Sequence, residues 1–110
     1  MIINISNPAK YELNKMFNEY KLSNKFFRVY IKELSAWYGP IFSIALDEPT
    51  GKDTIFDCDD FKVIINNDLC DKISVINIYY KSAMSSDIFR VSTDLLWKEE
   101  YYEAPWAKPW

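Results

Sequence analysis

The side chains of this 110-residue chain that could do chemistry are two thiols and a scatter of carboxylates, because the sequence contains no His. That absence removes the commonest general base and metal ligand, and every Ser-His or Cys-His catalytic arrangement with it. Acid–base chemistry would fall on carboxylates or Lys, and no pair of these stands out from the charge pattern. We therefore expect a protein that is not an enzyme.

The two thiols, Cys58 and Cys70, are the side chains that could ligate a soft metal. Their spacing matches no zinc motif, and in a reducing compartment both should stay unpaired. Cys70 falls in a short helical turn expected over 67–72, capped by Asn67 or Asp68, and a small buried thiol is its expected role. Cys58 lies near a predicted strand end and is expected to be the more exposed of the two.

Four aspartates around these cysteines offer oxygen atoms to a hard cation: Asp57, Asp59, Asp60 and Asp68. An EF-hand loop needs ligands spread over twelve residues and a central Gly. The stretch has neither, so calcium is not favoured. We expect no resident metal from these carboxylates.

Composition narrows the class of protein. An apolar share of 49% predicts one packed domain, and a net charge of −3 argues against a nucleic-acid partner. No apolar run approaches the ~18 residues of a membrane span. The first residues also lack the basic, apolar and small-residue regions that follow one another in a signal peptide. We expect a cytoplasmic protein with no membrane partner.

The elements that must position these side chains are strands joined by short turns, with one helix near the start. Asn7 is the expected N-cap and Pro8 the first helical residue. The helix should present one apolar stripe to a sheet, made of Ala9, Leu13, Met16, Phe17 and Tyr20. Strands are expected over 1–5, 25–33, 41–46, 54–58, 61–66, 75–81 and 88–91, which predicts an α+β fold with a mixed β-sheet or sandwich.

The segment 38–48 is predicted to be the central turn and strand of this fold. Gly39 and Pro40 should break the preceding element, so that a strand begins cleanly at Ile41. Phe42, Ile44 and Leu46 would form its apolar face. Something should pack closely on the opposite face, which carries small residues.

Four stretches give the chain its resemblance to a known family: 26–31, 39–48, 61–65 and 76–80, which read Phe-Phe-Arg-Val-Tyr-Ile, Gly-Pro-Ile-Phe-Ser-Ile-Ala-Leu-Asp-Glu, Phe-Lys-Val-Ile-Ile and Ile-Asn-Ile-Tyr-Tyr. In order and spacing they resemble the HesB-like domain of A-type iron-sulfur cluster carriers. The resemblance covers residues 1–92 and implies a HesB-like fold covered by an N-terminal helix. Residues 93–110 would be an aromatic C-terminal extension, opening with a short helix capped by Ser92 or Thr93 through Trp97.

The resemblance also implies a function, iron-sulfur cluster biogenesis, and a site. The family places a functional Cys in the loop before Gly39, where this chain has Trp37, and a Cys-x-Cys pair near its end, where this chain has none. An iron-sulfur cluster or iron is thus implied only by resemblance, with Cys58 and Cys70 as the candidate ligands. We expect a member that is degenerate in cluster ligation.

The alternative is a non-catalytic protein-interaction module or inhibitor that binds a protein partner or a second copy through aromatic side chains. Trp37 and Tyr38 would form one contact surface, unless Trp37 merely fills the pocket of the lost site. Trp97, Trp106 and Trp110 would form another, unless the tail docks on its own sheet. The sequence is compatible with both interpretations of the loop residues and with both interpretations of the tail.

Overall fold

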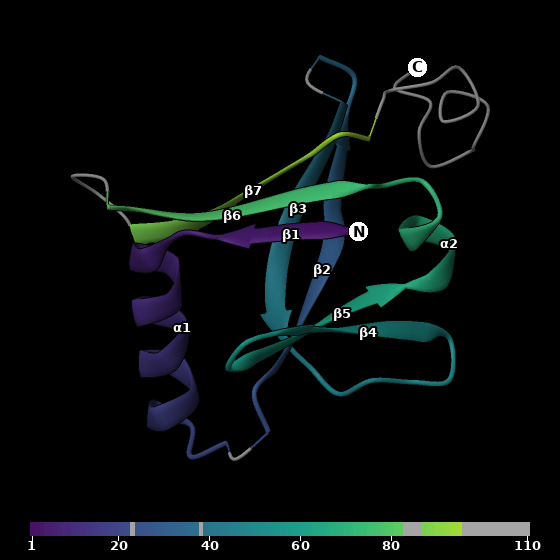
Figure 1. The fold of residues 1–110 in the computed structure, drawn as a ribbon. Helices are drawn as coiled ribbons and strands as arrows, with labels where there is room; N and C mark the ends of the chain where they lie inside the picture. The colour runs from purple at the N-terminus through teal and green to yellow at the C-terminus, as the bar shows by residue number, and fades with distance from the viewer. Residues whose placement is uncertain (23, 38, 83–86, 96–110) are drawn as a thin grey trace.

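The computed structural model describes residues 1–22, 24–37, 39–82 and 87–95, which form two β-sheets and two helices. Figure 1 shows α1 standing beside the strands and the β2–β3 hairpin, part of the four-stranded sheet, crossing behind the three-stranded sheet and projecting beyond it. The elements in chain order are β1 (Ile2–Ile5), α1 (Asn7–Glu19), β2 (Phe26–Ser35), β3 (Gly39–Leu46), β4 (Asp53–Cys58), β5 (Phe61–Asn66), α2 (Asn67–Cys70), β6 (Val75–Ser82) and β7 (Asp87–Thr93).

Both sheets are mixed, as the sequence predicts. The three-stranded sheet has the order β1-β6-β7, with β1 parallel to β6 and β7 antiparallel to it. The four-stranded sheet has the order β3-β2-β5-β4. Its central pair, β2 and β5, is parallel and pairs over only three positions, from Phe26 with Lys62 to Arg28 with Ile64.

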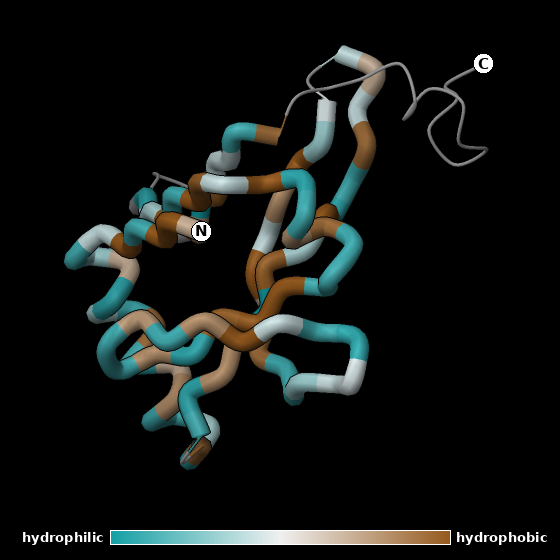
Figure 2. The backbone as a smooth tube through the Cα atoms, turned by 45° about the vertical axis from the view of Figure 1, so that its right-hand side comes forward, coloured by the Kyte–Doolittle hydropathy of each residue, from teal (hydrophilic) through white to brown (hydrophobic). Residues whose placement is uncertain are grey.

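The core lies where the inner faces of the two sheets meet α1. Figure 2 shows hydrophobic segments of strands from both sheets facing this interior. Each fully buried Phe, Ile, Leu or Val contributes about 1.5–3 kcal/mol relative to the exposed side chain. The cluster joins Ala9, Leu13 and Phe17 of α1 to Phe27, Val29, Phe61, Val63, Ile65, Ile76 and Ile78 of the strands.

The predicted start and stripe of the first helix each need a correction. Ser6, not Asn7, is the N-cap, because its backbone is extended and its hydroxyl accepts a hydrogen bond from the Ala9 N–H at 3.3 Å. Pro8 lies in the first turn, as expected. Tyr20 is exposed rather than part of the buried stripe, because the helix ends at Glu19.

The segment around Gly39 differs from the prediction in two ways. β3 begins at Gly39, whose φ of 75° favours glycine, and it includes Pro40. Pro40 is tolerated because β3 is an edge strand of its sheet. The face with small residues is not closely covered, since Ala45 is exposed.

The predicted hairpin about Asp59 and Asp60 is confirmed, with β4 antiparallel to β5. The turn of helix that follows is α2, and its N-cap is Asn66, whose side chain accepts from the Asp68 N–H, rather than Asn67 or Asp68. The expected helix from Ser92 or Thr93 is wrong at its start, because both residues belong to β7. The rest of it, with Trp97, lies outside the described residues, and the domain boundary at 92 and 93 stays a prediction.

Candidate functional site

The tip of the β2–β3 hairpin is the most exposed aromatic site in the described part of the chain. The Trp37 side chain is 90% exposed, and its backbone N–H donates to Ser35 Oγ at 3.2 Å. The hairpin carries it away from the body of the molecule (Figure 1). The interpretation that Trp37 fills a vacated pocket is therefore wrong, and Tyr38 lies outside the described residues.

Regular pairing along the hairpin holds this tip in place. β2 and β3 pair from Phe27 with Leu46 to Ser35 with Gly39, with one irregularity between Ile31 and Glu33. Such a bulge increases the local twist of a strand and changes the direction in which its end points. The tip is therefore built on a long, continuous ladder that reaches down to the buried Phe27 and Val29.

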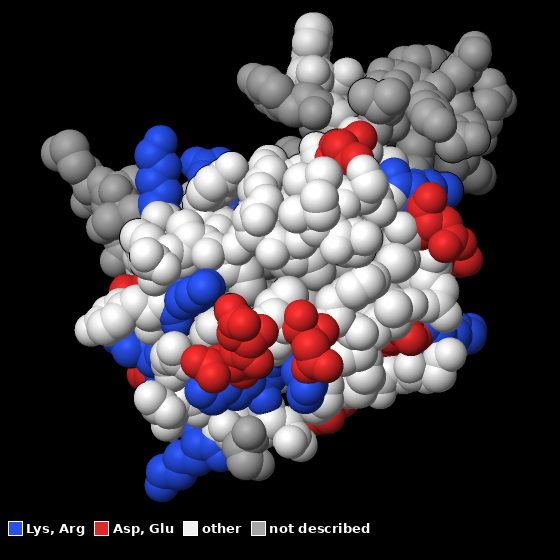
Figure 3. All heavy atoms as spheres, in the orientation of Figure 1, with Lys and Arg blue, Asp and Glu red and all other residues white. Residues whose placement is uncertain are grey.

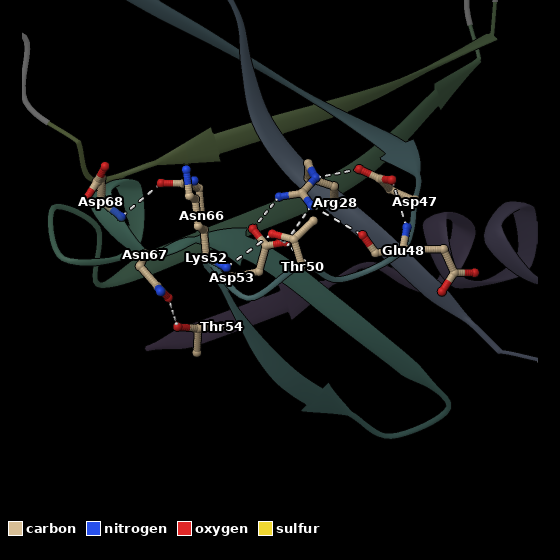
Figure 4. A network of polar contacts seen from close by, with 10 residues as sticks. All are labelled: Arg28, Asp47, Glu48, Thr50, Lys52, Asp53, Thr54, Asn66, Asn67 and Asp68. Atoms are coloured by element: carbon tan, nitrogen blue, oxygen red, sulfur yellow. Dashed lines mark hydrogen bonds and ion pairs between the residues drawn. The ribbon is translucent and has the colours of Figure 1, made fainter.

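At the base of the hairpin, Arg28 of β2 binds Asp47, directly after β3, and Asp53, the first residue of β4 (Figure 4). Its guanidinium donates to both carboxylate oxygens of Asp53 at 2.7 Å, and its Nε donates to Asp47 Oδ2 at 2.6 Å. Asp53 also accepts from the Thr50 N–H at 2.8 Å and the Thr50 hydroxyl at 3.0 Å. This cluster, the Arg28 network, fixes the loop between β3 and β4 against the first residues of β2.

The charges of the Arg28 network stabilise one another. The Asp53 side chain is 1% exposed, and its hydrogen bonds from Arg28 hold its pKa well below the ordinary value. The pKa of Asp47 is lowered by Arg28 and by the Glu48 N–H, and the pKa of Arg28 is raised by both carboxylates. All three groups therefore stay ionised near neutral pH and act as a structural clamp.

The solvent face of the three-stranded sheet is the second surface of note. In Figure 3 the region over β1 and β6 is largely uncharged, and charged side chains lie mainly around it. Across this face runs a side-chain ladder in which Asn4 Nδ2 donates to Asn77 Oδ1 at 2.9 Å and Asn77 Nδ2 donates to Ser92 Oγ at 3.4 Å. It bridges all three strands and supports the short parallel strand β1.

Sequence reasoning missed both the Arg28 network and the Asn ladder. An Arg in the middle of the apolar run 26–31 was the available signal for the first, because a charge in such a strand needs a partner. The Asn residues gave no such signal, since their pairing depends on the register of β1 with β6.

The structure does not bring the two candidate ligands, Cys58 and Cys70, together. Cys58 ends β4 and pairs with Phe61 at the start of β5, whereas Cys70 ends α2 beyond the far end of that strand. At about 3.3 Å per residue, β5 is ~17 Å long, and the two thiols lie beyond opposite ends of it. Both are free thiols of intermediate exposure, so Cys58 is not clearly the more exposed.

Cys58 lies in a shallow cavity of about 330 Å³ between β1, the start of α1 and β4. Burial raises the pKa of its thiol, and the nearby Asp59 and Asp57 carboxylates raise it further. Lys10 faces the same cavity, with Nζ 4.0 Å from Asp59 Oδ2. A raised pKa lowers the thiolate fraction, which is the form that binds metals.

Solved structures with this arrangement are known. IscA with the [2Fe-2S] cluster aligns at a TM-score of 0.68 and 14% identity, over 84% of this chain and 86% of IscA. Escherichia coli SufA, involved in biosynthesis of iron-sulfur clusters, aligns at 0.65 and 14%, over 83% and 79%. A protein from Aquifex aeolicus aligns at 0.65 and 18%, over 84% and 91%. The chain has the A-type carrier fold.

The HesB-like fold expected from the sequence is therefore confirmed. No protein-family model and no curated protein matches the chain, so the likeness is one of fold. Among the described residues, no helix has the length and apolar character that crossing a membrane requires.

The donor set of this A-type carrier fold does not fit a cluster held within one molecule. The hairpin tip offers Ser35, Ala36 and Trp37, and the two thiols lie apart on either side of β5. Within the described ranges, no three His, Cys, Asp or Glu side chains converge on a possible metal position. Trp97, Trp106 and Trp110, the other predicted contact residues, lie outside those ranges.

Proposed function

We propose that this chain is a non-catalytic protein-interaction module of cytosolic iron-sulfur cluster biogenesis, degenerate in cluster ligation. The observation that carries the proposal is the exposed indole of Trp37 at the tip of the projecting hairpin. Tryptophan is among the residues that contribute most to binding when a partner buries it. The shared fold with IscA and SufA supports the iron-sulfur setting.

The Arg28 network supports the same proposal from the base of the hairpin. A contact residue binds more tightly when the backbone beneath it is already ordered, because less entropy is lost on association. Asp53, Thr50 and Arg28 supply that order through hydrogen bonds of 2.7–3.0 Å. The hairpin is thus a rigid arm with an aromatic tip.

The partner we propose is a protein of the cluster-assembly machinery, and the probe for the test is purified IscA carrying its cluster. Titration calorimetry of the full chain against this carrier should give a measurable Kd. Trp37→Ala should weaken the affinity at least tenfold, since truncating a central aromatic residue commonly costs about 2 kcal/mol or more.

Tyr11→Ala is the matched control, because Tyr11 is also an exposed aromatic side chain, 67% exposed on the outer face of α1. It should leave the Kd unchanged. Equal affinities for the Trp37→Ala variant and the parent chain would reject the hairpin as the contact site. Absence of binding by the parent chain would reject the carrier as the partner.

A further inference from the structure

A groove lies between β3 and β7, each of which is an edge strand of its own sheet. The two strands contact each other where the sheets meet (Figure 1). The groove has a volume of about 390 Å³ and is lined by residues 41–44 of β3, residues 88–91 of β7 and Lys32 of β2. We call it the β3–β7 groove.

The lining shows that this groove runs along the two strands. Four consecutive residues come from each strand, whereas a groove over one face of a sheet would be lined by every second residue. In the described part of the chain, no backbone hydrogen bond joins β3 to β7, and no further strand pairs with the outer side of either. An extended segment suits such a site, because its backbone can run alongside an edge strand.

The walls of the groove are apolar and only half-buried. Five residues form them: Ile41, Ile44, Ile88, Phe89 and Val91. Ile44, Phe89 and Val91 also pack against the core cluster, so the fold holds the walls in place. A ligand with apolar side chains would remove the remaining apolar surface of these walls from water, which favours binding.

Two cations line the groove, and no carboxylate does. Lys32 and Arg90 are both exposed. Among the described residues, the ion pairs are formed by other cations, and neither Lys32 nor Arg90 has an ion pair or a side-chain hydrogen bond. Because the chain as a whole has a net charge of −3, the groove is a local region of opposite charge. Its charges therefore complement a ligand that carries carboxylates.

The position of Lys32 follows from the irregularity in the β2–β3 ladder. Ile31 pairs with Phe42 and Glu33 with Ile41, so Lys32 is the extra residue of β2 between these pairs. A bulge of this kind changes the direction of a side chain. It accounts for the presence of a β2 residue in a groove otherwise lined by β3 and β7.

We propose that the β3–β7 groove binds an extended acidic segment of a partner protein, whose apolar side chains lie against the walls and whose carboxylates pair with Lys32 and Arg90. The occupant is a partner rather than a second copy, because the acidic run 57–60 of this chain is already folded into the β4–β5 hairpin. The groove is separate from the Trp37 tip and does not depend on the proposed contact with IscA.

The probe for the test is a fluorescein-labelled peptide of sequence Asp-Ile-Glu-Val-Asp-Phe-Glu, and its matched control is the amide peptide Asn-Ile-Gln-Val-Asn-Phe-Gln. Fluorescence anisotropy with the full chain should show that the acidic peptide binds at least about fivefold more tightly than the amide peptide, as two exposed ion pairs would give. High salt should reduce this difference, because it screens exposed charges. Equal affinities for the two peptides, or no binding of the acidic one, would overturn the proposal.

A double variant, Lys32→Ala with Arg90→Ala, should weaken binding of the acidic peptide about fivefold and leave the amide peptide unaffected. The control variant, Lys15→Ala with Lys52→Ala, removes two exposed cations outside the groove and should leave both affinities unchanged. All four side chains are exposed, so both variants should fold. Equal effects of the two double variants would reduce the binding to net charge and contradict the proposal.

NMR spectroscopy of the labelled full chain locates the contact. The acidic peptide should shift the amide signals of residues 41–44 and 88–91 more than those of α1. Shifts confined to another part of the chain would refute the groove as the site. Signals of the groove that change on dilution of the chain without peptide would show that a second copy fills it, which also contradicts the proposal.

Discussion

Arg28 is a charged side chain in an otherwise apolar strand, and its two carboxylate partners explain how the strand accommodates it. The Asp53 carboxylate is almost completely buried, whereas Asp47 is 46% exposed. Removing one member of a buried ion pair leaves the other charge poorly compensated. The two aspartates should therefore contribute very differently to the stability of the fold.

Asp53→Asn should lower the free energy of unfolding by about 2–3 kcal/mol, somewhat less than a fully broken buried pair because Arg28 keeps Asp47. Asp47→Asn, the control, should cost about 1 kcal/mol or less, as expected for an exposed ion pair. Urea denaturation of the two variants and the parent measures both. Equal losses would show that the burial of Asp53 is not what makes its pair strong.

The same pair predicts a pH dependence. Because the pKa values of Asp53 and Asp47 are lower in the folded chain than the ordinary 3.8, the unfolded chain binds protons more readily. Their stabilisation is complete above the ordinary pKa and is lost as the pH falls through the folded pKa values. The urea midpoint should fall below pH 4, more steeply for the parent than for Asp53→Asn. Parallel curves for the two proteins would contradict this.

Cys58 should react slowly for a thiol of intermediate exposure, because burial and two carboxylates raise its pKa. In a Cys70→Ser background, Asp59→Asn should speed alkylation of Cys58 at pH 7 by about two- to threefold, because one of the carboxylates that raise its pKa becomes neutral. Iodoacetamide labelling followed by mass spectrometry gives the rate. No change would mean that burial alone sets the reactivity.

At the scale of elements, the N-cap of α1 is Ser6, one residue before the cap predicted at Asn7. Ser6→Ala should destabilise the protein by about 1 kcal/mol, because the Ala9 N–H loses its acceptor. Asn7→Ala should be nearly neutral, since Asn7 is the first residue inside the helix. Thermal unfolding of both variants decides between the two caps. A larger effect at Asn7 would restore the cap expected from the sequence.

The elements themselves could be predicted because their signals are local. Alternating apolar residues identified β1, β2, β5 and β6, and the Asp59-Asp60 turn identified the β4–β5 hairpin. The boundaries that failed depended on tertiary structure. Pro40 is allowed in β3 because the strand is at an edge, and Ser92 and Thr93 extend β7 because Asn77 and Ile76 pair with them.

At the scale of the whole molecule, the sequence led to the A-type carrier fold, and structures of IscA and SufA share it. The candidate site was harder to predict, because it depends on distances across the fold. The sequence places Cys58 and Cys70 only twelve positions apart, yet an intervening strand keeps them at opposite ends of β5. The exposure of Trp37 also could not be predicted from the residues next to it in the sequence.

Anaerobic reconstitution with iron and sulfide, followed by counting both per chain, tests the central claim most directly. The claim is that the fold is retained here without cluster ligation. Four thiolates are typical for an iron-sulfur cluster, and one molecule offers two that lie far apart. We predict less than about 0.1 iron per chain after desalting, and no visible absorbance from a cluster. Stoichiometric iron and sulfide that disappear in the Cys58→Ser, Cys70→Ser double variant would contradict the account.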